Sequence, residues 1–325
     1  MKKTSILSVG LLGVLLLSPL GVFAQGIGGA ASSALINLRV QRATYKQNLD
    51  FKQAQKAFQD AVVNGNKTLV NSLIKQYGSR IINTPFAEKD YTPRYPLIDA
   101  IESGNEEIIT ILVEAKADVN VRDVDADINF FSTSALGHAA FSCKTNIVTL
   151  LLNHGATDKN EALLWAATGN CVGATRVLLA RGATNKNEAL FAAIGPHGDT
   201  GYGGNLQVVN FLLEHKANVN AKSKSFGDTP LMGAAGGGYL KVVKTLLYHG
   251  AQVNLTDNMG QTALMWAVNS PWATLEMTTL LVKQGAKVNM TDKNGYTALD
   301  YAIENNGEDS EIVRYLRTRG AKTSR

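Results

Sequence analysis

The sequence predicts an all-α solenoid, a stack of about eight helix–turn–helix units with short β-hairpin fingers. The first observation is a helix-ending pair, Gly-Ala or Lys-Ala, that recurs along most of the chain. The pairs are Lys116-Ala117, Gly155-Ala156, Gly182-Ala183, Lys216-Ala217, Gly250-Ala251, Gly285-Ala286 and Gly320-Ala321. The second is a double apolar step before each pair, as in Leu246-Leu247. The third is spacing, since the helix-opening residues Leu231, Leu264 and Leu299 are 33 and 35 residues apart. A self-similar period of this size is typical of solenoid repeats.

Residues 1–24 are predicted to be an export signal. The basic Lys2-Lys3 precedes an apolar stretch from Ile6 to Leu17, and Val22-Phe23-Ala24 offers small residues at the signal peptidase positions. A membrane anchor is the alternative, because no charge follows Lys3 for some distance. The Gly/Ala/Ser-rich sequence beyond residue 24 is too weakly hydrophobic to extend a span. We therefore expect cleavage there and no membrane segment in the mature chain.

Residues 25–50 form a polar, basic segment with Ile36, Val40 and Ala43 on one helical face, and we interpret them as a linker or capping helix. The repeats fill residues 51–325. The first unit, Phe51 to Asn83, is divergent and keeps only a helical apolar stripe.

Each later unit has start and stop signals for its helices. In the last three units the first helix opens on Thr, a favoured N-cap residue, and in two units Pro96 or Pro230 follows the opening residue, where proline is tolerated in the first turn. Gly of the Gly-Ala pair is expected to end the second helix in a left-handed conformation. Asp/Asn-x-x-Gly runs between units, such as residues 257–260 and 292–295, predict turns that project as fingers.

The helix-opening phrase identifies a family resemblance. It stands as Thr229-Pro230-Leu231-Met232-Gly233-Ala234, with degraded copies at residues 95–100, 134–139, 262–267 and 297–302. This resembles the ankyrin repeat, whose first helix opens with Thr-Pro-Leu-His-x-Ala. The resemblance covers roughly residues 50 to 321. It implies a protein-binding module whose finger residues vary freely and contact partners.

Two units depart from this pattern. After Gly155 and after Gly182 the sequence leads from the end of one unit directly to the first helix of the next, with no residues left for a hairpin. The fourth and fifth units are therefore predicted to lack a finger. The fifth carries instead a Gly-rich insertion at residues 195–205.

The two cysteines, Cys143 and Cys171, fall in the helix–helix turns of consecutive units, one position out of register. An even number of cysteines in an exported chain favours a disulfide. Neighbouring helices lie about 8–10 Å apart, whereas bridged Cα atoms must be within roughly 7 Å. The sequence therefore leaves two alternatives for this pair, a disulfide bridge or two free thiols.

Charge and motifs exclude several function classes. A net charge of +5 is too weak to indicate a nucleic-acid binder. The five histidines do not gather into a metal site, and the Gly-rich runs lack a nucleotide-loop ending. We expect no cofactor, no metal and no enzyme activity. A catalytic or ligand-carrying role for His197, Asp199 and Tyr202 is the least favoured alternative.

Large apolar residues, most of them aromatic, at or beside the predicted finger tips indicate the partner-binding surface. With one neighbouring cation, the predicted partner-binding residues are Tyr91, Arg94, Phe130, Phe131, Phe226, Met259 and Tyr296. The aromatic residues in the middle of first helices, Trp165, Trp266 and Tyr301, are predicted to be core.

The sequence therefore predicts a monomeric, periplasmic protein that binds a folded protein partner through its finger tips and concave helix face. Similarity to exported bacterial ankyrin proteins implies either toxin immunity or help in oxidative-stress defence. The alternative is a secreted effector that binds host proteins.

Overall fold

The computed structural model describes residues 29–86, 94–123, 133–195 and 204–324, and for residues 29–37 and 45 the backbone only. The predicted leader at 1–24 lies outside these residues, as do His197, Asp199 and Tyr202. The chain divides into two compact units, Met1–Gln55 and Lys56–Arg325.

The described part of the first compact unit is helical. It forms most of α2 (Gly29–Val63). This helix continues without a break past residue 50, the predicted end of the linker or capping helix. The side chains of Val40 and Ala43 are exposed along this helix.

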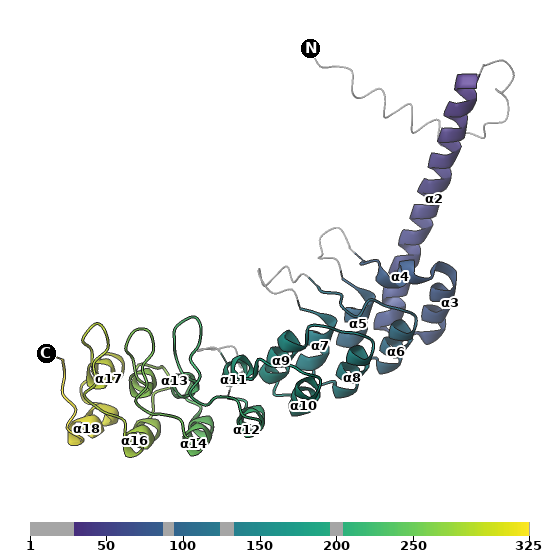
Figure 1. Cartoon of the computed structure of the whole chain (residues 1–325). Coiled ribbons are helices and arrows are strands. Elements are labelled where there is room, and N and C mark those ends of the chain that lie inside the picture. Colours follow the sequence, from purple (N-terminus) through teal and green to yellow (C-terminus); the bar gives the residue numbers. More distant parts are fainter. Residues whose placement is uncertain (1–28, 87–93, 124–132, 196–203, 325) are drawn as a thin grey trace, which may run out of the picture. The chain divides into compact units, whose positions relative to one another are not determined.

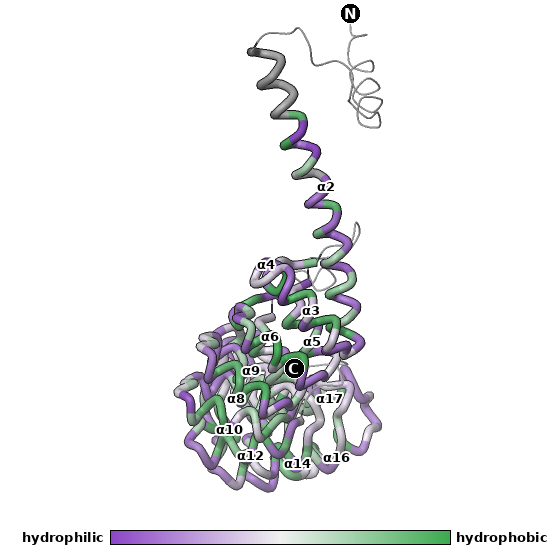
Figure 2. Tube along the Cα trace, turned by 90° about the vertical axis from the view of Figure 1, so that its right-hand side faces the viewer, coloured by the Kyte–Doolittle hydropathy of each residue, from purple (hydrophilic) through white to green (hydrophobic). Residues whose placement is uncertain are grey.

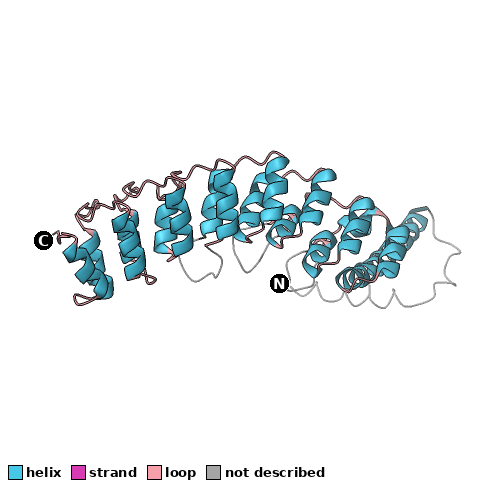
Figure 3. Ribbon diagram, turned by 90° about the horizontal axis from the view of Figure 1, so that it is seen from below, coloured by secondary structure: helices cyan, strands magenta, loops and turns pink. Residues whose placement is uncertain are grey.

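The second compact unit is a row of helix pairs (Figure 1). After the end of α2 come α3 (Lys67–Tyr77) and the short α4 (Ser79–Asn83). The pairs that follow are α5 (Pro96–Ser103) with α6 (Glu106–Glu114), α7 (Ala135–Phe141) with α8 (Thr145–Asn153), α9 (Lys159–Thr168) with α10 (Val172–Ala180), α11 (Lys186–Ile194) with α12 (Leu206–Glu214), α13 (Pro230–Gly236) with α14 (Leu240–Tyr248), α15 (Ala263–Val268) with α16 (Leu275–Lys283), and α17 (Ala298–Asn306) with α18 (Glu311–Thr318). Figure 3 shows helices and loops only in the described residues, which confirms the predicted all-α solenoid.

The core lies between successive pairs. First helices pack against first helices, as α7 against α9 and α13 against α15, and α8 packs against α10 in the second row. Apolar stretches recur in the helices and hydrophilic ones in the turns (Figure 2). The double apolar step is buried to different degrees: both residues are buried in Leu112-Val113 and Leu212-Leu213, but only one in Leu246-Leu247. Adjacent helical residues point about 100° apart, so Leu246 is fully buried and Leu247 only partly.

The predicted helix signals are confirmed. Thr229 and Thr262 accept hydrogen bonds at Oγ1 from the N–H groups of Met232 and Met265, both at 3.3 Å. The Gly of each Gly-Ala pair has φ between 79° and 93°, and Lys116 and Lys216 occupy the same slot at φ 70° and 67°. A residue that carries a Cβ atom is strained in this left-handed backbone conformation, whereas glycine is not.

An asparagine ladder ties each unit to the next. In each step a carboxamide oxygen accepts from a backbone N–H of the following unit at 2.8 to 3.0 Å. The pairs are Asn83 with Asp118, Asn120 with Thr157, Asn160 with Thr184, Asn187 with Asn218, Asn220 with Gln252, Asn254 with Lys287, and Asn289 with Lys322. The ladder passes through the fourth and fifth units without interruption.

In the described residues of the last five units, fingers are present where the sequence predicts them and absent where it does not. Isolated antiparallel bridges close finger bases at Thr256–Thr262 and Thr291–Thr297. The loops before α13, α15 and α17 rise as arches in Figure 1. Helix α9 begins at Lys159, directly after the turn that ends α8, and α11 follows α10 in the same way.

Candidate functional site

The candidate site is the row of finger tips in the last three units. Phe226 is 66% exposed and Met259 is 49% exposed, although both are large and apolar. They occupy the same finger position, since each is followed by a glycine in the left-handed conformation, Gly227 or Gly260. Tyr91, Phe130 and Phe131, predicted to share this surface, lie outside the described residues.

Backbone hydrogen bonds join the tips of neighbouring fingers. The N–H of Asn258 donates to the carbonyl of Phe226 at 2.8 Å, and the N–H of Lys293 donates to the carbonyl of Met259 at 2.9 Å. The three tips are therefore connected in series, and the apolar side chains project from a surface whose backbone groups are satisfied.

A buried aspartate supports each of the last two fingers from inside. Oδ1 of Asp257 accepts from the N–H groups of Met259 and Gln261, both at 2.8 Å. Asp292 repeats this with Asn294 and Tyr296 at 2.9 Å. Both aspartates are less than 8% exposed. Two backbone bonds to one carboxylate oxygen fix the finger turn.

Tyr296 differs from the other predicted finger-tip residues. It follows Gly295 instead of preceding it, so it takes the position of Gln261 in the preceding finger. Its ring lies 5.5 Å from that of Tyr301, centroid to centroid, and it is 37% exposed. Tyr296 therefore lies at the base of its finger, against the first helix.

Arg94 belongs to a charged cluster at the base of an earlier finger. Its guanidinium pairs with Asp99, Nε to Oδ1 at 2.8 Å, and with Glu102. His138 completes the cluster, with Nε2 at 2.7 Å from Asp123 and Nδ1 at 3.4 Å from Glu102. Asp99 and Glu102 lie in α5 of the same unit as Arg94, whereas Asp123 and His138 belong to the next unit, a pairing that the sequence does not reveal.

The cluster has distinct protonation behaviour. Burial raises the pKa of Asp99 to about 6, although nearby Arg94 acts to lower it. Burial also acts to raise the pKa of Asp123, but the hydrogen bond and charge of His138 outweigh it, and the net shift is downward. Burial acts to lower the pKa of Arg94, yet its carboxylate neighbours raise it overall.

Glu102, Asp123 and His138 offer ligand atoms within 4.8 Å of one another, which is the spacing of a possible metal site. Each of these groups is already paired, however: Glu102 with Arg94, and His138 with both carboxylates. Ion pairing accounts for the geometry of this cluster, and we derive no metal chemistry from it.

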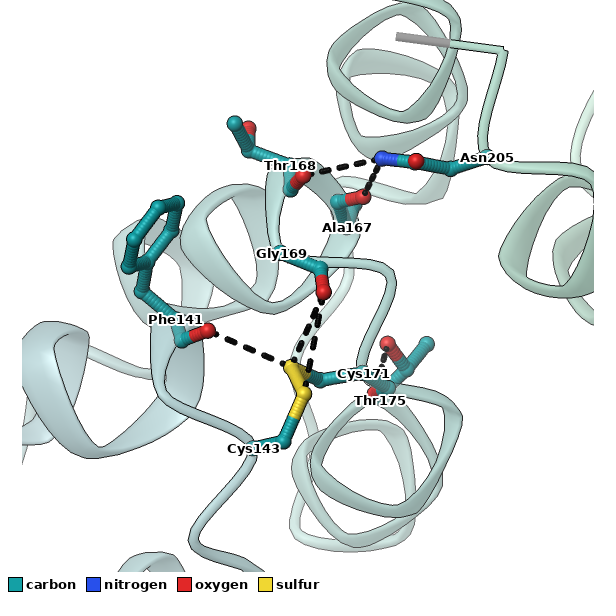
Figure 4. The surroundings of a disulfide bond; sticks show 8 residues. All are labelled: Phe141, Cys143, Ala167, Thr168, Gly169, Cys171, Thr175 and Asn205. Atoms are coloured by element: carbon teal, nitrogen blue, oxygen red, sulfur yellow. Dashed lines mark hydrogen bonds between the residues drawn. A yellow bond between two sulfur atoms is a disulfide. The ribbon is translucent and has the colours of Figure 1, made fainter. Parts of the chain in front are cut away.

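The structure joins Cys143 and Cys171 in a disulfide, with 4.9 Å between the two Cα atoms (Figure 4). The helix axes do not have to approach each other, because the bridge lies in the turns. Cys143 itself has φ 57°, as does Asn170, and these left-handed residues bring the turns together. The carbonyl oxygen of Phe141 lies 3.3 Å from Sγ of Cys171. The sulfur has no hydrogen to donate in the disulfide, so this is a packing contact until the bridge is reduced.

The prediction that Trp165, Trp266 and Tyr301 are core residues is wrong. All three are half-buried. Finger aspartates hold two of them: Trp266 Nε1 donates to Asp257 at 2.9 Å, and the Tyr301 hydroxyl donates to Asp292 at 2.7 Å. Burial and this hydrogen bond raise the pKa of Tyr301 to about 12.

Within the described residues, no helix has the length and apolar character needed to cross a bilayer.

Comparison with known proteins agrees with this architecture. A family model of three ankyrin repeats matches residues 197–292 and 254–325, and a single-repeat model matches residues 94–124. No curated protein matches the chain. Ankyrin repeats are generally protein–protein interaction modules. On the family matches and the helix-pair stack, the chain belongs to the ankyrin-repeat family.

Proposed function

We propose that this protein is an exported binding module that recognises a folded protein partner through the finger tips of its last three units. The observation that carries the proposal is the pair of exposed apolar side chains, Phe226 and Met259, on tips that hydrogen-bond to one another. Large apolar residues exposed side by side mark protein-binding surfaces. A tip backbone that is fixed before binding loses little conformational entropy in the complex.

Export is part of the proposal. The basic and apolar pattern of residues 1–24 supports it, and so does the disulfide, because such bridges persist in oxidising compartments and are rare in the cytosol. We propose the periplasm as the location. Cell fractionation with alkylation of free thiols tests this: we expect the protein in the periplasmic fraction with both cysteines unreactive. Recovery from the medium would favour the secreted alternative, and cytosolic protein with alkylated thiols would contradict export.

Affinity capture with matched variants tests the binding surface. The double variant Phe226→Glu and Met259→Glu places charges on the tips and should reduce partner recovery at least about tenfold, since buried apolar anchors dominate interface energetics. The control is Tyr248→Glu, because Tyr248 is 87% exposed at the end of α14, a second helix.

The control should retain the partner that the native chain captures. Equal recovery by the finger double variant would refute the proposal. Circular dichroism melting of both variants shows whether the stack stays folded, which we expect because all three substituted side chains are exposed.

A further inference from the structure

A pocket of about 360 Å³ lies beside α15, away from the finger tips. It begins at Gln261, the base of the finger of the seventh unit, and ends at the turn after the helix. Its lining residues are Gly236, Gln261, Trp266, Asn269, Ser270, Pro271 and Trp272. None of these is charged, so the pocket suits an uncharged ligand.

Two indoles form its apolar walls. Trp266 projects from α15 and is oriented by its hydrogen bond to Asp257. Trp272 is 52% exposed, and its loop is held in place: its N–H donates to Ser270 Oγ at 3.0 Å, and a side chain at Gly238 would meet its Cβ at 2.8 Å. The ring of Trp266 and the backbone of Trp272 are thus positioned before any ligand arrives.

Two amide side chains supply polar atoms of fixed identity. Tyr301 gives its only hydroxyl proton to Asp292, so it must accept from Gln261 Nε2, at 2.8 Å. Asn305 Nδ2 donates to Oδ1 of Asn269 at 2.7 Å. These contacts use Nε2 of Gln261 and Oδ1 of Asn269. Oε1 of Gln261 therefore remains as an acceptor and Nδ2 of Asn269 as a donor, neither of them paired with any described residue.

We propose that this pocket binds an uncharged, extended peptide segment with a proline ring against Trp266 and Trp272. The inference rests on the proposed protein-binding function and names the chemistry of a second contact. Proline-rich segments in the polyproline II conformation lack internal hydrogen bonds, and they dock on aromatic-lined grooves. Asn269 donates to a peptide carbonyl, and Gln261 accepts from the N–H of a neighbouring non-proline residue.

A neutral saccharide could also stack on indole rings, but it carries many hydroxyl groups that need partners when buried. One free amide donor and one free amide acceptor match a peptide unit better. The oligosaccharide is therefore the competing arm of the test.

The chain has three tryptophans, and this permits a clean experiment. The indole N–H signals of the mature ¹⁵N-labelled protein are followed by NMR while a capped nonapeptide of Pro-Ala-Pro triplets is added. We expect saturable shifts for Trp266 and Trp272 and none for Trp165, which does not line the pocket. A capped Gly-Ser nonapeptide and a neutral hexasaccharide should produce no shifts.

Two variants sharpen the result. Trp272→Ala should weaken peptide binding about tenfold or more, because an aromatic wall is removed at an exposed position. Asn269→Asp keeps the side-chain shape but replaces the free donor with an acceptor, and should weaken binding similarly.

Unchanged signals with the peptide, equal shifts at Trp165, shifts with the hexasaccharide, or full affinity in both variants would overturn the inference. The finger variant Phe226→Glu/Met259→Glu should still bind the nonapeptide. Loss of partner capture in that variant and loss of peptide binding in Trp272→Ala are therefore separate outcomes, which distinguishes failure of the pocket from failure of the finger-tip proposal.

Discussion

Removing the disulfide between Cys143 and Cys171 should destabilise the stack at the boundary between the third and fourth units. The bridge closes a loop with a sequence separation of 28 residues. In the chain-entropy description, releasing such a loop gives the unfolded chain freedom that amounts to about 3–4 kcal/mol. Reduced thiols recover part of this, because the carbonyl oxygens of Phe141 and Gly169 lie 3.3 Å from Sγ of Cys171 and can accept weak hydrogen bonds.

The assay compares urea unfolding of the native chain with that of Cys143→Ala, each with and without a phosphine reductant. Cys143 is the side to change because it is exposed, whereas Cys171 is only 2% exposed and an alanine there would leave a cavity. We expect the reduced native chain and the variant to unfold with nearly the same free energy, below that of the oxidised chain by at most about 3–4 kcal/mol. The variant itself should not respond to the reductant.

The location of the effect is a second measurement. In a repeat stack each unit contacts only its neighbours, so loss of one boundary should divide unfolding into two transitions. Amide hydrogen exchange should accelerate most in α8, α9 and α10, which flank the bridge. An unfolding midpoint that stays the same after complete reduction, verified by alkylation of both thiols, would refute the reasoning.

Three further predictions concern individual side chains. Asp99 has a folded-state pKa of about 6 against 3.8 in the unfolded chain, so the folded state binds more protons and stability is lost as pH rises from about 4 through 6. Asp99→Asn should therefore raise the free energy of unfolding at pH 7.5 by about 1–3 kcal/mol and remove this pH dependence in urea titrations, and an equal slope in both chains would contradict it. Lys216 and Gly250 both need a left-handed backbone, which glycine adopts without strain. Lys216→Gly should therefore stabilise the protein by about 1 kcal/mol, and Gly250→Ala should destabilise it by as much. A melting temperature that moves in the opposite direction in either variant would count against this conformational argument. Asn254→Ala removes the bonds to Lys287 N–H at 2.8 Å and the Gly285 carbonyl at 2.9 Å and should cost about 1–3 kcal/mol in urea unfolding, whereas an unchanged midpoint would show that water replaces the ladder at no cost.

Local features of the fold could be predicted from the sequence because each depends on a few adjacent residues. Thr229 at an N-cap, Gly250 after a helix and the missing fingers at Gly155 and Gly182 are read from the chain directly. The disulfide could be proposed but not decided, since the answer depended on turn geometry at Cys143.

Features that depend on register between units were missed. Four ladder asparagines follow a valine, at residues 119–120, 219–220, 253–254 and 288–289. In the fingerless units the ladder passes instead to Asn160 and Asn187, which follow lysines, and the sequence pattern does not indicate this. Trp266 was assigned to the core because a large apolar residue in a helix usually packs there. The equivalent position in the preceding unit is Gly233, so that unit has no side chain there to cover the ring of Trp266. Tyr296 lies beside its finger tip and not at it, because it follows Gly295, whereas Phe226 and Met259 precede their glycines.

The fingerless fourth and fifth units show how the stack keeps its order where tip-to-tip bonds are absent. Lys159 donates from Nζ to the carbonyl of Arg181 at 3.0 Å, and Lys186 to that of His215 at 2.9 Å. Each lysine thus binds the end of the second helix in its own pair, where carbonyl groups lack helical partners and a positive charge is favoured. The disulfide adds a covalent bond at the edge of the same region. The asparagine ladder, the two lysines and the disulfide all act through the backbone at the turns. The side chains at the finger tips and on the inner helix face therefore remain available for recognition of a partner. In the proposed binding mode, rigidity and specificity are therefore carried by different residues.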